Sequence, residues 1–436
     1  MEIAAYDSSK ISKLLYNINI ISALAMSSWI SWPYLRVNTG VLFFLIQFGI
    51  WFFTTDLVWV IKRVSADIIF ILIFFFTFIP YIAFGSLNYG TYGSKAIIVN
   101  FPIFFVGIFI NQYYMYYKKD YNALGKIAIV SLIMYTIGSV QTYAGLIKYP
   151  LAARILGTGE GLYEAEKAIF TQMGIGTFGH INSSCFLCIA MLYLFLKKRN
   201  NIRPAFKIIA MISSLIIFLM ILKASFAITI LIFFTGFILV LLVKNRKAFF
   251  ATIFLLAILL LIIPNEIIGK FLLDIASIFG TDSVIYEKLS DLAVGFLGES
   301  MGEQTGYRLK LYLTSLLTFL KQPLFGINGP FGNPYDSIGM HSGWLDFIAF
   351  FGLFSGIPLF MTIYNNFKKN LIYFKGNSFC GYIIVVQFLF LIFGLINPNL
   401  FVYEIGFVTF CIIPSIPFIN YCIKDRKHKR VNDINT

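Results

Sequence analysis

Few side chains of this chain can carry acid–base or ionic chemistry, and several of them stand where a polar loop meets an apolar segment. His341, one of three histidines, follows the loop "GINGPFGNPYDSIGM" and precedes an apolar run. A neutral imidazole accepts a proton from an attacking hydroxyl near neutral pH. Arg308 and Arg154 lie in long loops, and a guanidinium stays protonated while it pairs with two phosphate oxygens. These residue types suit proton transfer and phosphate binding.

Further polar residues at or inside apolar segments are candidates for the same site. His180 lies in "GTFGHINSS" and Lys223 in "LKASFA". Glu404, in "FVYEIGF", is an acid at membrane depth, and such residues are functional candidates by default. Asp346 follows His341 on the expected helix at a rotation of about 140°, which disfavours a direct pair between the two side chains.

Each candidate also has a simpler structural interpretation. An arginine near a membrane interface often only anchors its segment by snorkelling. His341 is suited to cap a helix through hydrogen bonds, His180 to pack at a helix entrance, and Lys223 to mark a turn between two apolar runs. The patterns alone leave both interpretations open.

The composition places these candidates in a membrane protein. Of the 436 residues, 59% are hydrophobic and 12% are charged, whereas soluble domains carry about 25% charged residues. Apolar runs of about 20 residues, the length that crosses a bilayer, recur from end to end. We therefore predict an all-α polytopic membrane protein, with one integral membrane domain over 1–436 and about twelve spans. The expected spans are 14–32, 39–55, 67–84, 96–115, 126–146, 179–196, 207–222, 224–243, 248–264, 343–364, 379–396 and 400–420.

The charges predict the orientation of these spans. The formal net charge is +14, and the basic residues gather in every second connector, such as "YYKKDYNALGK" and "KKRNNIRPAFK". The positive-inside bias puts these connectors, both termini and a basic tail at 422–436 in the cytoplasm. The basic balance therefore reflects topology and contact with anionic lipids of the bilayer. Scattered basic residues without an aromatic platform argue against nucleic-acid binding.

Two outer loops, at 147–178 and 265–342, are longer than the other connectors. Long loops in compact folds are usually functional. Within the second loop, "GYRLKLYLTSLLTFLKQP" repeats leucines at three- and four-residue steps and stops at Pro323, which predicts a helix. Cationic residues flank and enter this segment, so we expect an amphipathic helix at the outer interface, at the level of lipid head groups.

No metal site and no cofactor are predicted. Cys185 and Cys188 form a C-x-x-C inside the apolar run "SSCFLCIAM", where small polarizable packing residues are expected. The spacing from His341 to Asp346 matches no zinc pattern.

Two blocks of the sequence combine the candidate residues with turn and glycine patterns. One is "YRLKLYLTSLLTFLKQPLFGING" followed by "HSGWLDFIAFFGLFSGIP", with Gly352 and Gly356 in its apolar part. The other is "GTFGHINSS", which follows Arg154. In both, over about residues 126–360, the chain resembles the superfamily of O-antigen and capsular polysaccharide polymerases and O-antigen ligases. Those proteins carry an Arg-led helix, a Pro-Leu-hydrophobic-Gly turn, His-Ser before a span, and Gly-x-Phe-x-His-Pro-Asn.

The chain departs from this family pattern in three places. The turn from Pro323 to Gly329 has one extra residue, and Ile181 stands where proline is usual. In "LKASFA", Phe226 occupies the position of an arginine. Under the resemblance, Lys223 is the substitute cation of this turn.

The resemblance implies a membrane glycosyltransferase of type C architecture in the bacterial inner membrane, acting at the outer face without metal or cofactor. The donor would be an undecaprenyl-pyrophosphate-linked oligosaccharide, and a polymerase would transfer the growing chain onto a new repeat unit. His341 and Arg308 would be catalytic, and the pyrophosphate and glycan would be bound by Arg154, His180 and Lys223. Its partners in O-antigen, capsule or exopolysaccharide synthesis would be a chain-length regulator and a flippase.

Two other functions stay open. An O-antigen ligase would use the same donor and residues but transfer the glycan to lipid A-core. A lipid-linked oligosaccharide flippase or other transporter would suit twelve spans, but no internal repeat is visible and the candidate cations gather at the outer face. In either transferase, outer aromatic residues such as Tyr335 and Trp344 would stack on sugars.

Overall fold

The computed structural model describes most of the chain, and structural statements refer to that part. It covers residues 2–56, 59, 66–84, 96–158, 164–196, 203–243, 265–278, 280–281, 286–287, 289–290, 293–294, 303–328 and 336–422, without the side chains at several helix ends, including those of residues 2–11 and 303–309. The expected span 248–264, residue Tyr335 and the tail from residue 423 onward lie outside the described residues.

All regular secondary structure in the described ranges is helical. Eight helices are long and apolar enough to cross a membrane, and three shorter apolar helices lie at Ile68–Ala83, Ile228–Leu242 and Cys380–Ile396. Together they overlap in sequence with all the expected spans that lie in the described residues. The predicted polytopic α-helical architecture is confirmed, while the count of twelve spans and the cytoplasmic termini stay predictions.

The helices are named in chain order. The first half contains α1 (Glu2–Ser31), α2 (Pro33–Thr54), α4 (Ala66–Phe76), α5 (Phe78–Phe84), η2 (Ala96–Asn100), α6 (Phe101–Asn111), η3 (Gln112–Tyr117), α7 (Tyr121–Lys148), α8 (Ala152–Thr158), α9 (Glu164–Gln172) and α10 (Phe178–Leu196). The second half contains α11 (Pro204–Ala224), α12 (Ala227–Leu242), α14 (Asn265–Ser277), α16 (Glu303–Lys321), α17 (Gly343–Tyr373), α18 (Cys380–Ile396), η4 (Pro398–Phe401), α19 (Tyr403–Phe407), η5 (Val408–Ile412), α20 (Ile413–Ser415) and η6 (Ile416–Phe418).

One end of the bundle, which we call the basic end, is defined by contacts of Asp120 and Lys118 with segments far away in the sequence. There the Tyr16 hydroxyl donates to the Asp120 carboxylate at 2.6 Å. Lys118 pairs with Asp56 at 3.4 Å.

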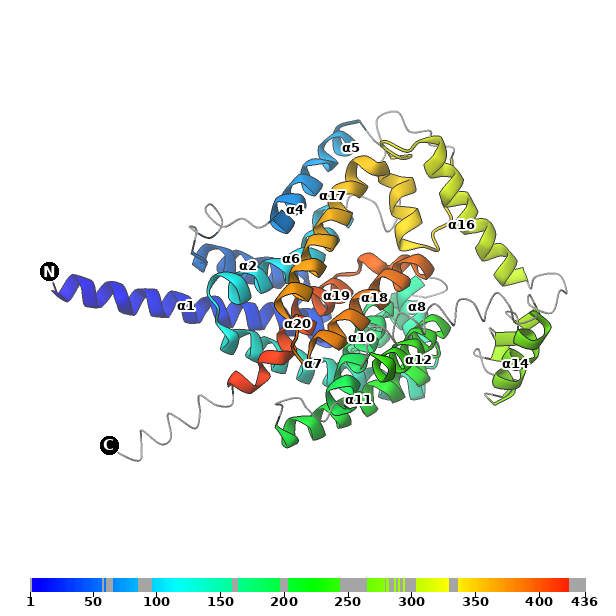
Figure 1. Ribbon diagram of the computed structural model, residues 1–436, viewed down its shortest axis with the longest axis horizontal. Coiled ribbons are helices and arrows are strands. Elements are labelled where there is room, and N and C mark those ends of the chain that lie inside the picture. The colour runs from blue at the N-terminus through cyan, green and yellow to red at the C-terminus, as the bar shows by residue number, and fades with distance from the viewer. Residues whose placement is uncertain are drawn as a thin grey trace.

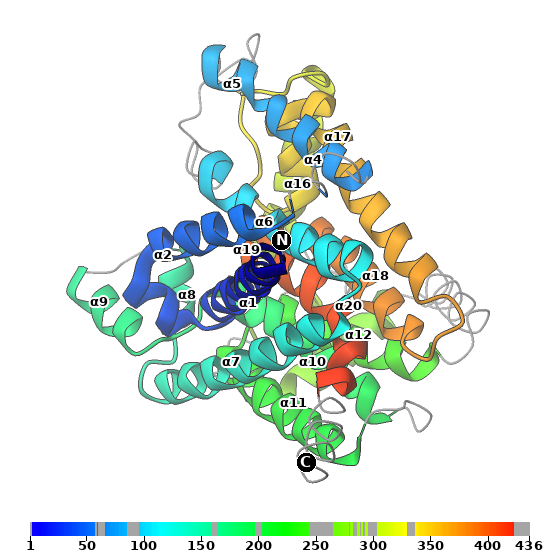
Figure 2. The same ribbon diagram turned by 90° about the vertical axis from the view of Figure 1, so that its left-hand side faces the viewer.

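The chain enters the bundle through α1 from the left of Figure 1, while α14 and α16 lie at the right. Figure 2, seen from that left-hand side, looks almost along α1, with α2 and α7 beside it.

Two helical arms joined at Gly40 make up α2. Gly40 has φ 66° and ψ 177°, outside the helical range, and its carbonyl accepts a hydrogen bond from the Trp29 indole at 3.0 Å. Proline at the first helical position, as at Pro33, suits a helix start because its missing N–H is not needed there. The short arm, 33–39, is therefore separate from the long arm, 41–54, which corresponds to the expected span 39–55.

The chain folds back inside α17, so the expected span 343–364 is wrong as a single crossing. Gly352 has φ 62° and ψ −169°, which interrupts the helix. The rings of Trp344 and Phe360 lie 5.3 Å apart, whereas a straight helix would separate these positions by about 24 Å. The result is a helical hairpin with a short arm, 343–351, and a long arm, 353–373, that reverses near α5 (Figure 1).

A turn directly after α16, at residues 323–328, fastens this hairpin, and we call it the clamp. It supplies partners for backbone groups that the interruption of a helix leaves without intrahelical hydrogen bonds. Its four hydrogen bonds run from Ile327 N–H to Ala349 O at 3.0 Å, from Asn328 N–H to Phe350 O at 3.1 Å, from Leu353 N–H to Pro323 O at 2.8 Å and from Phe354 N–H to Leu324 O at 2.9 Å. The clamp therefore links α16 to both arms of α17.

Replacing Gly352 by alanine should destabilise the protein. A Cβ at this position would lie 2.2 Å from the Leu324 carbonyl oxygen, and the φ of 62° is unfavourable for any side chain. We expect a loss of about 1–3 kcal/mol from the backbone conformation alone, measured as a lower thermal unfolding midpoint of the purified protein. Gly356→Ala is the matched control, because its Cβ would meet only Ile348 at 3.5 Å and Phe360 at 3.8 Å. Equal midpoints for the two variants would contradict the role of Gly352.

Candidate functional site

His341 lies in the loop before the short arm of α17 and is half-buried. Its Nδ1 is 2.9 Å from the carbonyl oxygen of Gly339. A carbonyl oxygen can only accept, so in the neutral imidazole Nδ1 carries the hydrogen and donates, and Nε2 keeps the lone pair. This is the tautomer in which Nε2 can act as a general base.

The loop around His341 is held on both sides by one buried carboxylate. Ser315 of α16 accepts a hydrogen bond from the Gly339 N–H at 2.8 Å and donates its hydroxyl to Asp346 Oδ1 at 2.5 Å. Asp346 Oδ2 accepts from the Ser342 N–H at 2.8 Å. Both oxygens of Asp346 are thus used to fix the loop, in agreement with the expectation that Asp346 and His341 form no direct pair.

Helix α16 packs against the same loop. A Cβ at Gly339 would lie 2.0 Å from the carbonyl oxygen of Leu311, so the two backbones are in close contact. Arg308 precedes Leu311 by about one helical turn. The structure therefore brings the helix that carries Arg308 to the His341 loop, while the Arg308 side chain lies outside the described residues.

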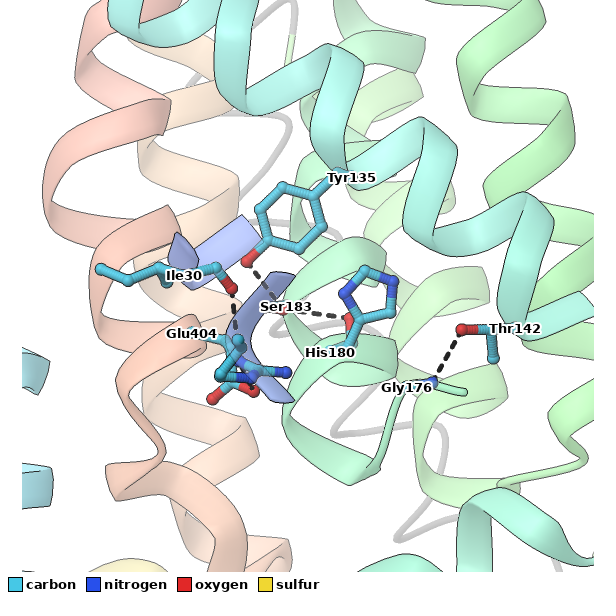
Figure 3. A network of polar contacts seen from close by, with 8 residues as sticks. Ile30, Tyr135, Thr142, Gly176, His180, Ser183 and Glu404 are labelled. Atoms are coloured by element: carbon cyan, nitrogen blue, oxygen red, sulfur yellow. Dashed lines mark hydrogen bonds and ion pairs between the residues drawn. The ribbon is translucent and has the colours of Figure 1, made fainter. Parts of the chain in front are cut away.

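His180 lies in the first turn of α10 and is fully buried. Its ring stacks on Tyr135 of α7, with centroids 5.3 Å apart and planes at 9° (Figure 3). Two glycines leave room for the imidazole, because a Cβ at Gly138 would lie 2.9 Å from its Cε1 and a Cβ at Gly176 2.5 Å from its Cδ2. Within the described part of the chain neither ring nitrogen has a hydrogen-bond partner. The imidazole is enclosed by protein and not displayed on a surface.

Hydrogen bonds around His180 fix the start of α10. The Tyr135 hydroxyl donates to Ser183 Oγ at 3.1 Å, and Ser183 donates to the His180 carbonyl at 3.0 Å. The Gly176 N–H donates to Thr142 Oγ1 at 2.8 Å. Figure 3 shows Tyr135 and Thr142 of α7 bonded to Ser183 of α10 and to Gly176 just before it. Three side chains and two backbone groups therefore set the position of this turn.

Arg154 and Lys223 lie on two elements that meet the start of α10 at Phe178. Arg154 is half-buried in α8, and a Cβ at Gly157 of that helix would lie 2.3 Å from the Phe178 ring. Lys223 is half-buried in the last turn of α11, and Phe226 just beyond it has its ring 4.6 Å from that of Phe178. The structure thus gathers the elements that carry Arg154, His180 and Lys223 around one aromatic ring.

The connector between α18 and α19 joins the His341 loop to the start of α10. On one side the Gly343 N–H donates to the Asn397 carbonyl at 3.0 Å. On the other side, a Cβ at Gly179 would lie 2.6 Å from Val402 Cγ1 and 2.7 Å from Glu404 Oε2. We call the end of the bundle that contains this connector, the His341 loop and the start of α10 the site end.

A buried ion pair at the site end was not predicted from the sequence. Arg36 Nη1 and Glu404 Oε1 are 2.6 Å apart, with side-chain exposures of 12% and 2%. The same Nη1 donates to the Ile30 carbonyl at 3.3 Å, and the guanidinium lies 5.3 Å from the centre of the Tyr403 ring. Figure 3 shows Glu404 beside Ile30 and across from Tyr135 and His180. The sequence signal was Glu404 itself, because an acid in an apolar segment needs a cation as partner.

The expectation that Trp344 stacks on sugars is wrong. Its side chain is 6% exposed, and its indole N–H donates to the Leu391 carbonyl at 2.9 Å. The ring packs against Phe360, Phe390 and Phe401 inside the bundle. The fold-back of α17 turns this residue inward, which hydropathy does not reveal.

The thiols of the C-x-x-C are used in packing contacts. Cys185 and Cys188 are buried in α10, with Sγ atoms 3.6 Å and 3.3 Å from the carbonyl oxygens of Thr229 and Ser214. Among the residues that the structure describes, no three His, Cys, Asp or Glu side chains are grouped so that they could hold a metal ion.

The apolar helices define a class, a multi-pass α-helical membrane protein. The elements that carry its candidate residues contact one another at one end of the bundle. No family model matches the chain, and no curated protein is significantly similar to it. The function must therefore be inferred from the site and from the sequence resemblance.

Proposed function

We propose that the protein is a polymerase of undecaprenyl-pyrophosphate-linked oligosaccharide repeat units. It would transfer a growing glycan from its lipid carrier onto a new repeat unit at the outer face of the bacterial inner membrane. The product would be an O-antigen, a capsule or an exopolysaccharide. The observation that carries this proposal is the fixed orientation of His341 beside the helix that bears Arg308.

The His341 loop has the properties that a general base requires. Its imidazole is half-buried and held through Nδ1, which leaves Nε2 as the proton acceptor. Asp346 and Ser315 fasten the loop from both sides, so little reorientation is needed before a proton is accepted. Preorganised groups of this kind account for a large part of catalysis by positioning.

The cations of the site end suit the other half of the reaction. A pyrophosphate leaving group gains negative charge as its bond to the sugar breaks, and fixed cations stabilise that charge. Arg154 in α8 and Lys223 in α11 come from elements that meet at Phe178. Arg308 is carried by α16, which contacts the His341 loop. These three cations are the proposed ligands of the pyrophosphate.

In the proposed reaction an acceptor hydroxyl attacks the anomeric carbon of the donor sugar. Its proton passes to Nε2 of His341 while the new glycosidic C–O bond forms. The bond between the anomeric carbon and the pyrophosphate oxygen breaks, and the lipid-linked pyrophosphate leaves with the electron pair. No atom is oxidised or reduced, and the proton later returns to water.

The direct test is elongation by the purified protein in lipid nanodiscs, supplied with undecaprenyl-pyrophosphate-linked repeat units. Mass spectrometry of the products should show a ladder of lipid-linked oligomers that grows with time. A preparation that stays folded but never forms a dimer of repeat units would contradict the proposal. Transfer only to added lipid A-core would indicate a ligase, and movement of the donor across vesicles without a new bond would indicate a flippase.

A further inference from the structure

We propose that Arg36, held by Glu404, is a binding site for the phosphate-type oxyanion of a lipid head group at the site end. The proposal rests on the function proposed above only in naming the diphosphate of the polyprenyl donor as the head group. It adds a residue from the start of the chain to cations that all lie between residues 154 and 308. Its basis is the geometry of the ion pair, its burial and its surroundings.

The ion pair with Glu404 uses one nitrogen of the guanidinium, and a further hydrogen bond joins the guanidinium to the Tyr403 side chain. A carboxylate that satisfies an arginine fully uses two oxygens against two nitrogens. Here one nitrogen of Arg36, Nη1, meets one oxygen of Glu404, and the same Nη1 makes the bond to Ile30. The donors that these three contacts leave open keep the planar arrangement that matches phosphate oxygens.

The remaining N–H donors of Arg36 reach the surface of the protein. The side chain of Arg36 keeps 12% exposure although Glu404 is 2% exposed. Glu404 Oε2 is a buried polar atom without a described partner. No nitrogen of Arg36 is both buried and without such a partner. The accessible edge of the guanidinium therefore contains nitrogen donors. An oxyanion can approach that edge without displacing Glu404.

Glu404 is built into the protein as the orienting partner. Its backbone lies in the first turn of α19, and its carboxylate lies against Gly179, where a Cβ would be 2.7 Å from Oε2. The carboxylate therefore lies in close contact with α10 and has little room to move toward it. The guanidinium is further confined by the Tyr403 ring at 5.3 Å. A confined cation loses little conformational freedom when it binds an anion.

The surroundings of Arg36 point to a lipid head group. It sits on the short arm of α2, whose neighbouring side chains Tyr34 and Val37 are 39% and 43% exposed. Beyond Gly40, Leu42 is 65% exposed. In a membrane protein such apolar exposure faces lipid. An arginine at the edge of a lipid-facing segment meets head groups, and those of membrane lipids carry phosphate.

The test measures binding of radiolabelled undecaprenyl diphosphate to the full chain in nanodiscs, with uncharged undecaprenol as the control lipid. The double variant Arg36→Gln with Glu404→Gln removes both charges, so no buried charge is left unpaired. Its affinity should be about 10- to 100-fold lower, because hydrogen bonds to charged groups contribute about 1.5–3 kcal/mol. Arg36→Lys keeps the charge but loses the fork, and should bind with intermediate affinity.

The matched control is a second double variant, Lys118→Gln with Asp56→Asn, which removes an ion pair at the basic end. It should bind undecaprenyl diphosphate with wild-type affinity. If Arg36→Gln with Glu404→Gln melts at the wild-type temperature and also binds with wild-type affinity, the pair is only structural and the inference is wrong. Equal wild-type affinity for undecaprenol and undecaprenyl diphosphate would overturn it as well.

Inorganic diphosphate as competitor separates the two sources of this anion. Displacement at concentrations close to those of the lipid means that the oxyanion alone is recognised. Displacement only at large excess means that the lipid is recognised together with its head group. Either result supports oxyanion binding at Arg36, provided that the Arg36→Gln, Glu404→Gln variant no longer shows the binding that diphosphate displaces.

The inference and the proposed function fail separately. If the wild-type protein binds undecaprenyl diphosphate through Arg36 but never elongates repeat units, the binding site is supported and the polymerase function is contradicted. If the wild-type protein elongates repeat units but the Arg36→Gln, Glu404→Gln variant binds undecaprenyl diphosphate normally, the polymerase function is supported and the binding site is contradicted.

Discussion

Arg36→Ala should lower the free energy of unfolding by about 3–5 kcal/mol, because it leaves the carboxylate of Glu404 buried without its cation. Glu404 is 2% exposed and its Oε2 already lacks a described partner, so no other group can replace Arg36 without rearrangement. The expected readout is a large drop in the thermal unfolding midpoint and in the yield of folded protein in detergent. Glu404→Ala should have an effect of similar size.

Two comparisons identify the buried charge as the cause. Replacing both residues by glutamine should recover most of the lost stability, since neither charge is then left alone. Lys118→Ala breaks an ion pair whose side chains are 33% and 36% exposed, and exposed pairs contribute only about 0–1 kcal/mol. A double glutamine variant as unstable as Arg36→Ala would show that the pair does not act through its charges.

His341→Ala should slow the elongation of repeat units by about 100- to 10,000-fold, the usual contribution of a general base. The loop itself should survive, because Asp346 and Ser315 bind its backbone and not the imidazole. Donor binding and the thermal unfolding midpoint should therefore stay near the wild-type values. The measurement is the initial rate of oligomer formation at saturating donor, together with the donor affinity.

His428, in the basic tail, provides a histidine control. His428→Ala should elongate repeat units at the wild-type rate. If His341→Ala does so too while it remains folded, the imidazole only caps the loop, and another group must accept the proton. A loss of folding in His341→Ala, with rate and yield falling together, would also contradict the assigned role.

Local patterns in the sequence were sufficient for most of the helices. Apolar runs long enough to cross a bilayer do not depend on tertiary partners, because the membrane supplies the burial. The leucine spacing and Pro323 predict the helix that carries Arg308, and the structure has this helix at Glu303–Lys321. The family pattern likewise includes the turn that forms the clamp and Gly352, which contact each other in the structure.

Features that depend on distant contacts were beyond the sequence. Hydropathy is the same whether the chain crosses the membrane or reverses at Gly352, and the reversal is stabilised by hydrogen bonds to the clamp. Trp344 was misjudged for the same reason. Arg36 and Glu404 are separated by almost the whole chain, so no spacing rule joins them. The depth of Glu404 in an apolar segment makes it a candidate, whereas no pattern in the sequence singles out Arg36.

The helical hairpin of α17 has a consequence for how the protein is made. Its short arm carries Ser342, Gly343 and Trp344, whose partners Gly394, Asn397 and Leu391 are synthesised later. The insertion machinery therefore handles the apolar stretch before the surface that will hold its first turns exists. The His341 loop can reach its final position only after α18 has entered the bilayer. Assembly of the proposed active site is thus a late event of biogenesis, and a nascent chain that ends before residue 391 would lack it.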